Sequence, residues 1–185
     1  MSSILIYDKI AIFDHIIDNM YLGDINAVKD SVLMEEIDVV INVSNLKYPE
    51  FPAKKYFHLE MYDNPSFKID PVLDQFDRIM EELGLNPNES HEESSHVKER
   101  GEESTSVLPK VLIHCMAGIS RSVTLMVYYL MNYKFMTLKE SFDLLSTTRE
   151  QDSSPNFGFY KQLRRIEKDI FGHNSMTLQD YKTFF

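Results

Sequence analysis

The residues best suited to chemistry gather in one short stretch, HCMAGISRS, at positions 114 to 122. An apolar run, Val111 to Ile113, leads into this stretch, and a second apolar run follows Arg121. The pattern predicts a strand, a loop and a helix. The chain's only cysteine, Cys115, lies where the strand meets the loop. The sequence therefore predicts a nucleophile at a strand-to-helix junction.

A cysteine attacks as the thiolate, and a helix N-terminus or a nearby cation favours that form. Cys115 precedes the predicted helix. The loop amides that follow it can surround an anion if Gly118 takes a backbone conformation closed to other residues. We expect a phosphate-binding cradle with the thiolate at its base, and its binding residues are Met116, Ala117, Gly118, Ile119, Ser120 and Arg121.

Three side chains complete this predicted cradle. Arg121 closes the loop and can offer two parallel donors to phosphoryl oxygens, a geometry that lysine lacks. The Ser122 hydroxyl is placed to donate to the thiolate and to stabilise it as a leaving group. For His114 we expect a structural role, in which a buried imidazole holds the loop through backbone hydrogen bonds, ahead of direct proton transfer.

A buried free cysteine usually serves as a small apolar residue. The spacing of Cys115, Gly118, Arg121 and Ser122 is far more specific than that role requires. A single cysteine also excludes an internal disulfide and a thiolate metal cluster. We therefore expect chemistry from Cys115, and we expect neither a metal nor a cofactor.

Hydrophobic periodicity predicts the elements that must hold this loop. We expect a helix over 27–36 with Asn26 as its N-cap, then strands over 37–44 and 54–61. A further helix is predicted from Asp70, the N-cap before Pro71, to Gly84. This alternation of strands and helices favours an α/β fold in which helices cover a sheet.

The last third of the chain is predicted to be helical. Residues 121–133 are apolar on most sides, which indicates a central helix packed on the sheet. Thr137 with Glu140 predicts a capping box for the next helix. Ser154 and Pro155 are expected to start a third helix over about 156–170, and TLQDYKTFF is expected to close the fold as a tail or short helix.

Between Leu85 and Pro109 the chain is rich in glutamate and nearly free of apolar residues. We predict a flexible acidic insertion at about 86–108, which is either a solvated loop or a docking segment with phosphorylatable serines. His91 and His96 lie within it, but a five-residue spacing in a polar loop is a weak signal for metal binding.

Length and composition set further limits. The chain has 185 residues, 43% of them hydrophobic, which predicts a single domain over 1–185. No apolar run approaches the ~20 residues that span a bilayer, and a net charge of −10 disfavours nucleic acid and anionic membranes as partners. We expect a soluble cytoplasmic protein, with the nucleus as the alternative, and the oligomeric state is left open.

HCMAGISRS closely resembles the signature of the cysteine-dependent protein phosphatases, and its AGISRS portion is most similar to their dual-specificity branch. MYLGDINAV (20–28), VINVS (40–44) and SPNFGFYKQLRRIE (154–167) resemble further segments of that family, and Arg149 falls where the family commonly has an arginine. The resemblance runs from about Ile12 to Phe171. This resemblance implies that the protein is a small, single-domain, atypical dual-specificity phosphatase, with a central mixed, mostly parallel sheet flanked by helices.

The resemblance also implies a general acid. Family members carry an aspartate on the loop after the strand that ends here near Met61; Asp63 fits that position, and Asp70 is its rival. Asp63 would protonate the leaving oxygen and then activate water against the cysteinyl phosphate. Asn156 and Phe157 are expected either to shape the pocket or only to cap and pack their helix.

The activity that the resemblance implies is hydrolysis of phosphotyrosine, phosphoserine and phosphothreonine in proteins, with a protein kinase among the candidate partners. Two other substrates are alternatives: a phosphoinositide, although MAGIS contains no lysine, and an RNA 5′-phosphate, although the chain is acidic. An alternative of a different class is a non-catalytic pseudophosphatase that binds phosphosites.

Overall fold

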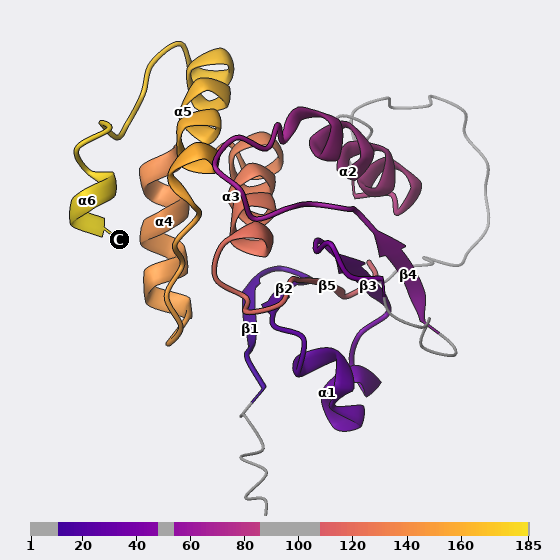
Figure 1. The fold of residues 1–185 in the computed structure, drawn as a ribbon. Helices are drawn as coiled ribbons and strands as arrows, with labels where there is room; N and C mark the ends of the chain where they lie inside the picture. The colour runs from indigo at the N-terminus through magenta and orange to yellow at the C-terminus, as the bar shows by residue number, and fades with distance from the viewer. Residues whose placement is uncertain (1–10, 48–53, 86–107, 185) are drawn as a thin grey trace, which may run out of the picture.

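The computed structural model describes residues 11–47, 54–85 and 108–184. These residues form a five-stranded sheet with helices on both faces (Figure 1). The predicted acidic insertion at about 86–108 lies outside the described residues except for Leu108, and so do His91 and His96.

The sheet is mixed and mostly parallel, as expected. Its strands follow the order β1 (Phe13–Ile17), β2 (Met20–Gly23), β5 (Val111–His114), β3 (Val39–Asn42) and β4 (Lys55–His58). β1 pairs with β2 in antiparallel fashion, and every other neighbouring pair is parallel. β5 therefore lies at the centre of the sheet, and the loop that carries the cysteine leaves from its carboxyl end. The β1–β2 hairpin was not predicted.

Successive residues of each strand point to opposite faces of the sheet, and their side chains therefore pack into two separate hydrophobic cores. Val40 and Leu112 pack on the face covered by the 3-10 helix η1 (Ala27–Lys29) and by α1 (Ser31–Glu35). Ile41 and Ile113 belong to the larger core on the other face. That face carries the longer helices, which are α2 (Asp70–Glu82), α3 (Arg121–Lys134), α4 (Leu138–Thr148) and α5 (Phe157–Phe171) (Figure 1).

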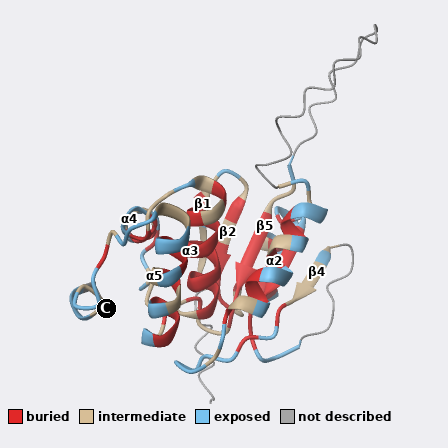
Figure 2. Ribbon diagram, turned by 90° about the horizontal axis from the view of Figure 1, so that it is seen from above, coloured by how far each residue is buried: buried red, intermediate tan, exposed pale blue. Residues whose placement is uncertain are grey.

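Helix α3 is the central helix that the sequence predicted. Almost all of its residues are buried, and in Figure 2 it lies beside the buried strands β2 and β5. Tyr128 and Tyr133 of α3 both donate a hydrogen bond of 2.7 Å to the carboxylate of Asp77, which joins α3 to α2. The position of α3 fixes Arg121, its first residue.

The helix predicted over 27–36 is wrong as a single element. Asn26 itself has helical backbone angles and its side chain caps nothing; its side-chain amide nitrogen donates to Asp24 Oδ2 at 2.9 Å. The chain is extended at Asp30, whose carboxylate accepts from the N–H groups of Val32 and Leu33 and starts α1. Two short helices therefore replace the predicted one.

The predicted N-cap of the next helix is also wrong. Asp70 is the first residue of α2 rather than its N-cap, and its carboxylate pairs with Arg165 of α5. The helix predicted over about 156–170 is confirmed: α5 starts at Phe157, with Asn156 as its N-cap, and Ser154 and Pro155 precede it. The capping box of Thr137 and Glu140 is confirmed.

The chain's last described segment is helical and docks on α5. Helix α6 (Tyr181–Phe184) places the Tyr181 ring 5.0 Å from that of Phe157 and 5.1 Å from that of Tyr160. The Tyr181 hydroxyl donates to the Pro155 carbonyl at 3.1 Å. This segment therefore supports the start of α5 from outside.

Replacement of the observed cap should cost more stability than replacement of its neighbour. We expect Asp30→Ala to lower the free energy of unfolding by about 1 kcal/mol, because two N–H groups of α1 lose their acceptor. Glu35→Ala, at the exposed end of the same helix, is the control and should change it by less than about 0.5 kcal/mol. Urea unfolding measures both; equal losses would contradict the cap assignment.

Candidate active site

The sheet gathers the predicted site residues at the carboxyl ends of its parallel strands. Strand β5 ends at His114, residues 115–120 form a loop, and α3 begins at Arg121. β3 runs parallel to β5, so the residues that follow β3 lie at the same edge of the sheet. Asp63, which follows β4 by several residues, reaches this loop as well.

The sulfur of Cys115 is buried and accepts two hydrogen bonds. The Gly118 N–H donates to it at 3.3 Å and the Ser122 hydroxyl at 3.2 Å. Only 2% of the Cys115 surface is exposed. Both donors stabilise negative charge on the sulfur, so the arrangement suits a thiolate.

The loop needs glycine at position 118. Gly118 has a φ of 69°, in the left-handed region that favours glycine. A Cβ atom there would also lie 3.0 Å from the Gly23 carbonyl oxygen at the end of β2. Tight packing against β2 and an unusual backbone conformation together bring the Gly118 N–H under the sulfur.

The guanidinium of Arg121 is buried beside the loop. Its Nη1 donates to Asn45 Oδ1 at 3.0 Å and to the Met61 carbonyl at 3.4 Å. Its Nε is buried and has no hydrogen-bond partner among the described residues; the nearest acid is Asp63, with Oδ2 3.8 Å away. A buried guanidinium N–H without a partner is suited to an anionic ligand, because burial without a hydrogen bond is costly.

Asp63 faces the loop across the mouth of the site. Its Oδ1 accepts hydrogen bonds of 2.8 Å from the Ser120 hydroxyl and from the Asn156 side chain. The same Asn156 side chain caps α5 by accepting from the Phe159 N–H at 3.1 Å. Asn156 therefore does both things that the sequence left open: it caps its helix and it holds the carboxylate.

The approach of the Asp63 segment to α5 depends on Gly158. A Cβ atom at this position would lie 1.8 Å from the Pro65 carbonyl oxygen, a distance that no side chain can occupy. The absence of a side chain lets the backbone near Pro65 lie directly on the first turn of α5. Asp63 and Asn156 can thus meet.

His114 is fully buried at the end of β5, and its Nδ1 lies 3.2 Å from the Cys115 carbonyl oxygen. Burial lowers the pKa of this imidazole to about 4, against the opposing effect of that hydrogen bond. A neutral, buried ring bonded to the backbone is what a structural role requires.

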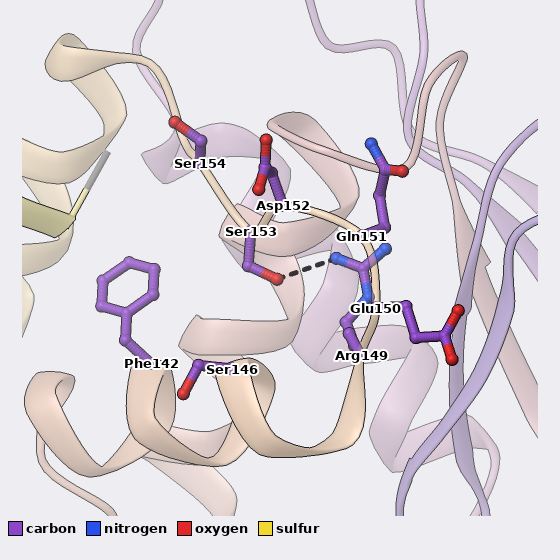
Figure 3. A pocket seen from close by; sticks show the side chains of 8 residues that line it. All are labelled: Phe142, Ser146, Arg149, Glu150, Gln151, Asp152, Ser153 and Ser154. Atoms are coloured by element: carbon purple, nitrogen blue, oxygen red, sulfur yellow. Dashed lines mark hydrogen bonds between the residues drawn. The ribbon is translucent and has the colours of Figure 1, made fainter.

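A cavity of about 350 Å³ lies beside the loop rather than over the sulfur. Figure 3 shows its lining side chains, which come from α4 and from the segment that joins α4 to α5. They are Phe142, Ser146, Arg149, Glu150, Gln151, Asp152, Ser153 and Ser154. Arg149 connects this cavity to the loop, because its Nη2 donates to the Gly118 carbonyl at 2.8 Å.

Sequence reasoning missed three contributors: Asn45, Ser120 as a partner of Asp63, and the contacts of Arg149. Asn45 lies just beyond β3, so its place next to β5 follows once the parallel pairing is known. The hydroxyl of Ser120 and the guanidinium of Arg149 contact residues 57 and 31 positions away. No local pattern signals contacts of that range.

The part of the chain that the structure describes contains no cluster of three His, Cys, Asp or Glu side chains that could hold a metal ion. Nor is any helix within those residues long and apolar enough to cross a bilayer.

The fold and this loop define the class of the protein. A central parallel strand that ends in a cysteine loop, closed by a buried arginine at a helix start, is the arrangement of the cysteine-dependent phosphatases. Residues 95–169 match the family described as dual specificity phosphatase, catalytic domain. The chain belongs to the dual-specificity phosphatases.

Two relatives illustrate the match. Human dual specificity protein phosphatase 16 is 34% identical over 160 residues, which are 84% of this chain and 21% of that protein. MAP kinase phosphatase with leucine-rich repeats protein 3 of Dictyostelium discoideum is 28% identical over 173 residues, 91% of this chain and 17% of that protein. The chain thus spans only a small part of the length of these relatives.

Solved structures share the fold. Human DUSP28 superimposes with a TM-score of 0.64 at 18% identity, over 85% of this chain and 93% of that one. DUSP15 superimposes with a TM-score of 0.67 at 20% identity, over 94% and 96%.

The low pKa of His114 predicts how it responds to acid. An imidazole with a pKa of about 4 in the folded chain and about 6.5 in the unfolded chain stays neutral at pH 5. Its contribution to the free energy of unfolding is complete above pH 6.5 and is lost as the pH falls towards 4, a loss on the order of 3 kcal/mol. NMR titration of the ring protons checks this, and a midpoint near 6.5 would contradict it.

Proposed function

We propose that this chain is a cysteine-dependent protein phosphatase that hydrolyses phosphotyrosine, phosphoserine and phosphothreonine through a cysteinyl-phosphate intermediate. The observation that carries the proposal is the pairing of two unusual groups in one loop. The Cys115 sulfur accepts two hydrogen bonds while buried, and the Nε of Arg121 is buried with no acceptor among the described residues. A phosphoryl group between them would meet a nucleophile and a cation.

In the first step, the Cys115 thiolate attacks phosphorus, the S–P bond forms, and the bond from phosphorus to the substrate oxygen breaks. Arg121 and the amides of residues 116–121 bind the phosphoryl oxygens. Asp63 gives its proton to the leaving oxygen. Because Oδ1 of Asp63 already accepts two hydrogen bonds, we assign the proton to Oδ2, which faces Arg121.

In the second step, Asp63 removes a proton from water, the water oxygen attacks phosphorus, and the S–P bond breaks. The sulfur leaves as a thiolate, which the Ser122 hydroxyl stabilises through the hydrogen bond seen at 3.2 Å. His114 takes no part in proton transfer in this scheme, in keeping with its low pKa and burial.

The substrates that we propose are phosphoproteins, with protein kinases among them, in the cytoplasm or the nucleus. The net charge of −10 supports this choice over nucleic acids and anionic lipids, which reward basic surfaces. We further propose that the chain forms one catalytic domain interrupted by the acidic segment at about 86–108, with no metal or cofactor in the reaction.

Replacement of the nucleophile separates catalysis from binding. We expect Cys115→Ser to reduce hydrolysis of p-nitrophenyl phosphate to the uncatalysed background while a phosphotyrosine peptide still binds, because the loop amides and Arg121 remain. Initial rates and peptide titration measure the two effects. Binding without turnover by the wild-type chain would instead indicate a pseudophosphatase, and turnover of phosphoinositides or RNA 5′-phosphates alone would indicate another substrate class.

Replacement of the general acid should depend on the leaving group. Asp63→Asn is expected to slow phosphopeptide hydrolysis by about 10²- to 10⁴-fold, because the alkoxide or phenolate then leaves without a proton. The loss should be much smaller for p-nitrophenyl phosphate, whose leaving group needs little assistance.

Asp70→Asn is the matched control for this variant. Asp70 was the rival acid by sequence, yet its carboxylate pairs with Arg165 on the exposed surface. We expect its kcat to equal that of the wild type on both substrates. Equal losses on both substrates for Asp63→Asn, or a loss for Asp70→Asn, would reassign the acid.

A further inference from the structure

The backbone of the cysteine loop is held by donors that lie outside it. The Cys115 and Ser120 carbonyl oxygens bond to His114 and Thr124 of the flanking elements β5 and α3. Three further carbonyl oxygens of the loop accept hydrogen bonds from residues beyond those elements. The Ile25 N–H donates to the Met116 carbonyl at 3.3 Å, and the Ser154 N–H donates to the Ile119 carbonyl at 3.0 Å. Arg149 Nη2 donates to the Gly118 carbonyl at 2.8 Å.

These contacts determine where the loop N–H groups point. In a trans peptide the C=O and the following N–H point in opposite directions, and the described residues contain no cis peptide. Each carbonyl that is turned outward therefore turns the next N–H inward. The N–H groups of Ala117, Ile119 and Ser120 follow the three held carbonyls.

Arg149 is the only side chain among these three donors, and its guanidinium is fixed on every side. Nε donates to Asp14 Oδ2 of β1 at 2.8 Å, and Nη1 donates to the Ser153 hydroxyl at 2.9 Å (Figure 3). The Arg149 side chain has no exposed surface, and the Asp14 carboxylate balances its charge. A buried, paired guanidinium is a rigid donor.

The two peptide units around Gly118 have separate partners. The N–H of Gly118 belongs to the preceding peptide and donates to the Cys115 sulfur at 3.3 Å. The carbonyl of Gly118 belongs to the next peptide, with the N–H of Ile119, and is held by Arg149. One unit can therefore turn without the other.

We propose that Arg149, held in place by Asp14, is a positioning residue that turns the Ile119 N–H into the loop, where it binds a phosphoryl oxygen. The inference rests on the proposed function and adds a side chain that contacts neither the substrate nor the sulfur. Without the guanidinium, the peptide between Gly118 and Ile119 is free to rotate and present its carbonyl oxygen to the anion.

Tungstate, a tetrahedral oxyanion, is the probe, and calorimetric titration of the whole chain measures its binding. We expect Arg149→Met to weaken tungstate binding about tenfold to a hundredfold, the range for loss of one hydrogen bond to a charged group. The pH midpoint of Cys115 alkylation by iodoacetamide should stay at the wild-type value, because the donors to the sulfur are unchanged. A general loosening of the loop would shift both quantities.

Arg164→Met is the matched control. Arg164 also donates from a guanidinium to a backbone carbonyl, that of Met176 at 2.7 Å, in the segment that follows α5. Its tungstate affinity should equal that of the wild type. Equal affinities of Arg149→Met and the wild type, or equal losses in the two arginine variants, would overturn the proposal.

Asp14→Asn keeps the test valid if Arg149→Met fails to fold. This variant retains an acceptor for Arg149 Nε but removes the charge that fixes the guanidinium, so we expect a smaller loss of tungstate affinity. Unchanged affinity in this variant would overturn the proposal.

The same experiment distinguishes a failure of the proposed function from a failure of the positioning role of Arg149. A wild-type chain that binds tungstate, with the Arg149→Met loss, but hydrolyses no phosphomonoester would refute the function and support the positioning role. A wild-type chain that binds no tungstate would overturn the inference.

Discussion

The active site that we propose is governed by one constraint: a sulfur with almost no access to water can carry negative charge only if nearby dipoles replace the water. The N–H of Gly118 and the hydroxyl of Ser122 supply those dipoles at Cys115. The first comes from the loop between β5 and α3 and the second from the first turn of α3. The centre of the sheet and the buried helix must therefore both be in place before these dipoles can surround the sulfur. The position of β5 between two parallel neighbours is therefore a chemical requirement as well as a packing one.

Around this centre, the two ends of the site are held by different means. The cation, Arg121, begins a buried helix and is held by Asn45 and the Met61 carbonyl. The acid, Asp63, belongs to a half-exposed segment and is held by side chains of Ser120 and Asn156. A buried cation gives a fixed phosphate site, whereas a carboxylate at the surface can exchange protons with water. This difference matches the roles that we propose, which are phosphate binding for Arg121 and proton transfer for Asp63.

The sequence predicted what depends on neighbours along the chain. The strand-loop-helix around Cys115, the central helix and the capping box at Thr137 all follow from local spacing. Local patterns failed where two local solutions compete. Asn26 and Asp30 are both residue types that cap helices well; the Asn26 side chain instead donates to the Asp24 carboxylate, and Asp30 provides the cap. The β1–β2 hairpin was not predicted because its strands are short and its turn contains no glycine, although Asp18 in that turn has a φ of 47°. Contacts across the fold carry no local signal at all.

The outside donors of the cysteine loop come from the region after β2 and from the segment between α4 and α5, so the loop takes its shape only when both ends of the described fold have met. Each of these distant contacts must overcome the entropy of closing a long loop. An anion that binds the loop binds the assembled chain and not the unfolded one. At a concentration 100 times its dissociation constant it stabilises the native state by about 2.7 kcal/mol. Any phosphorylated ligand that this protein binds therefore also protects it from unfolding, and hence from proteases that attack the unfolded chain.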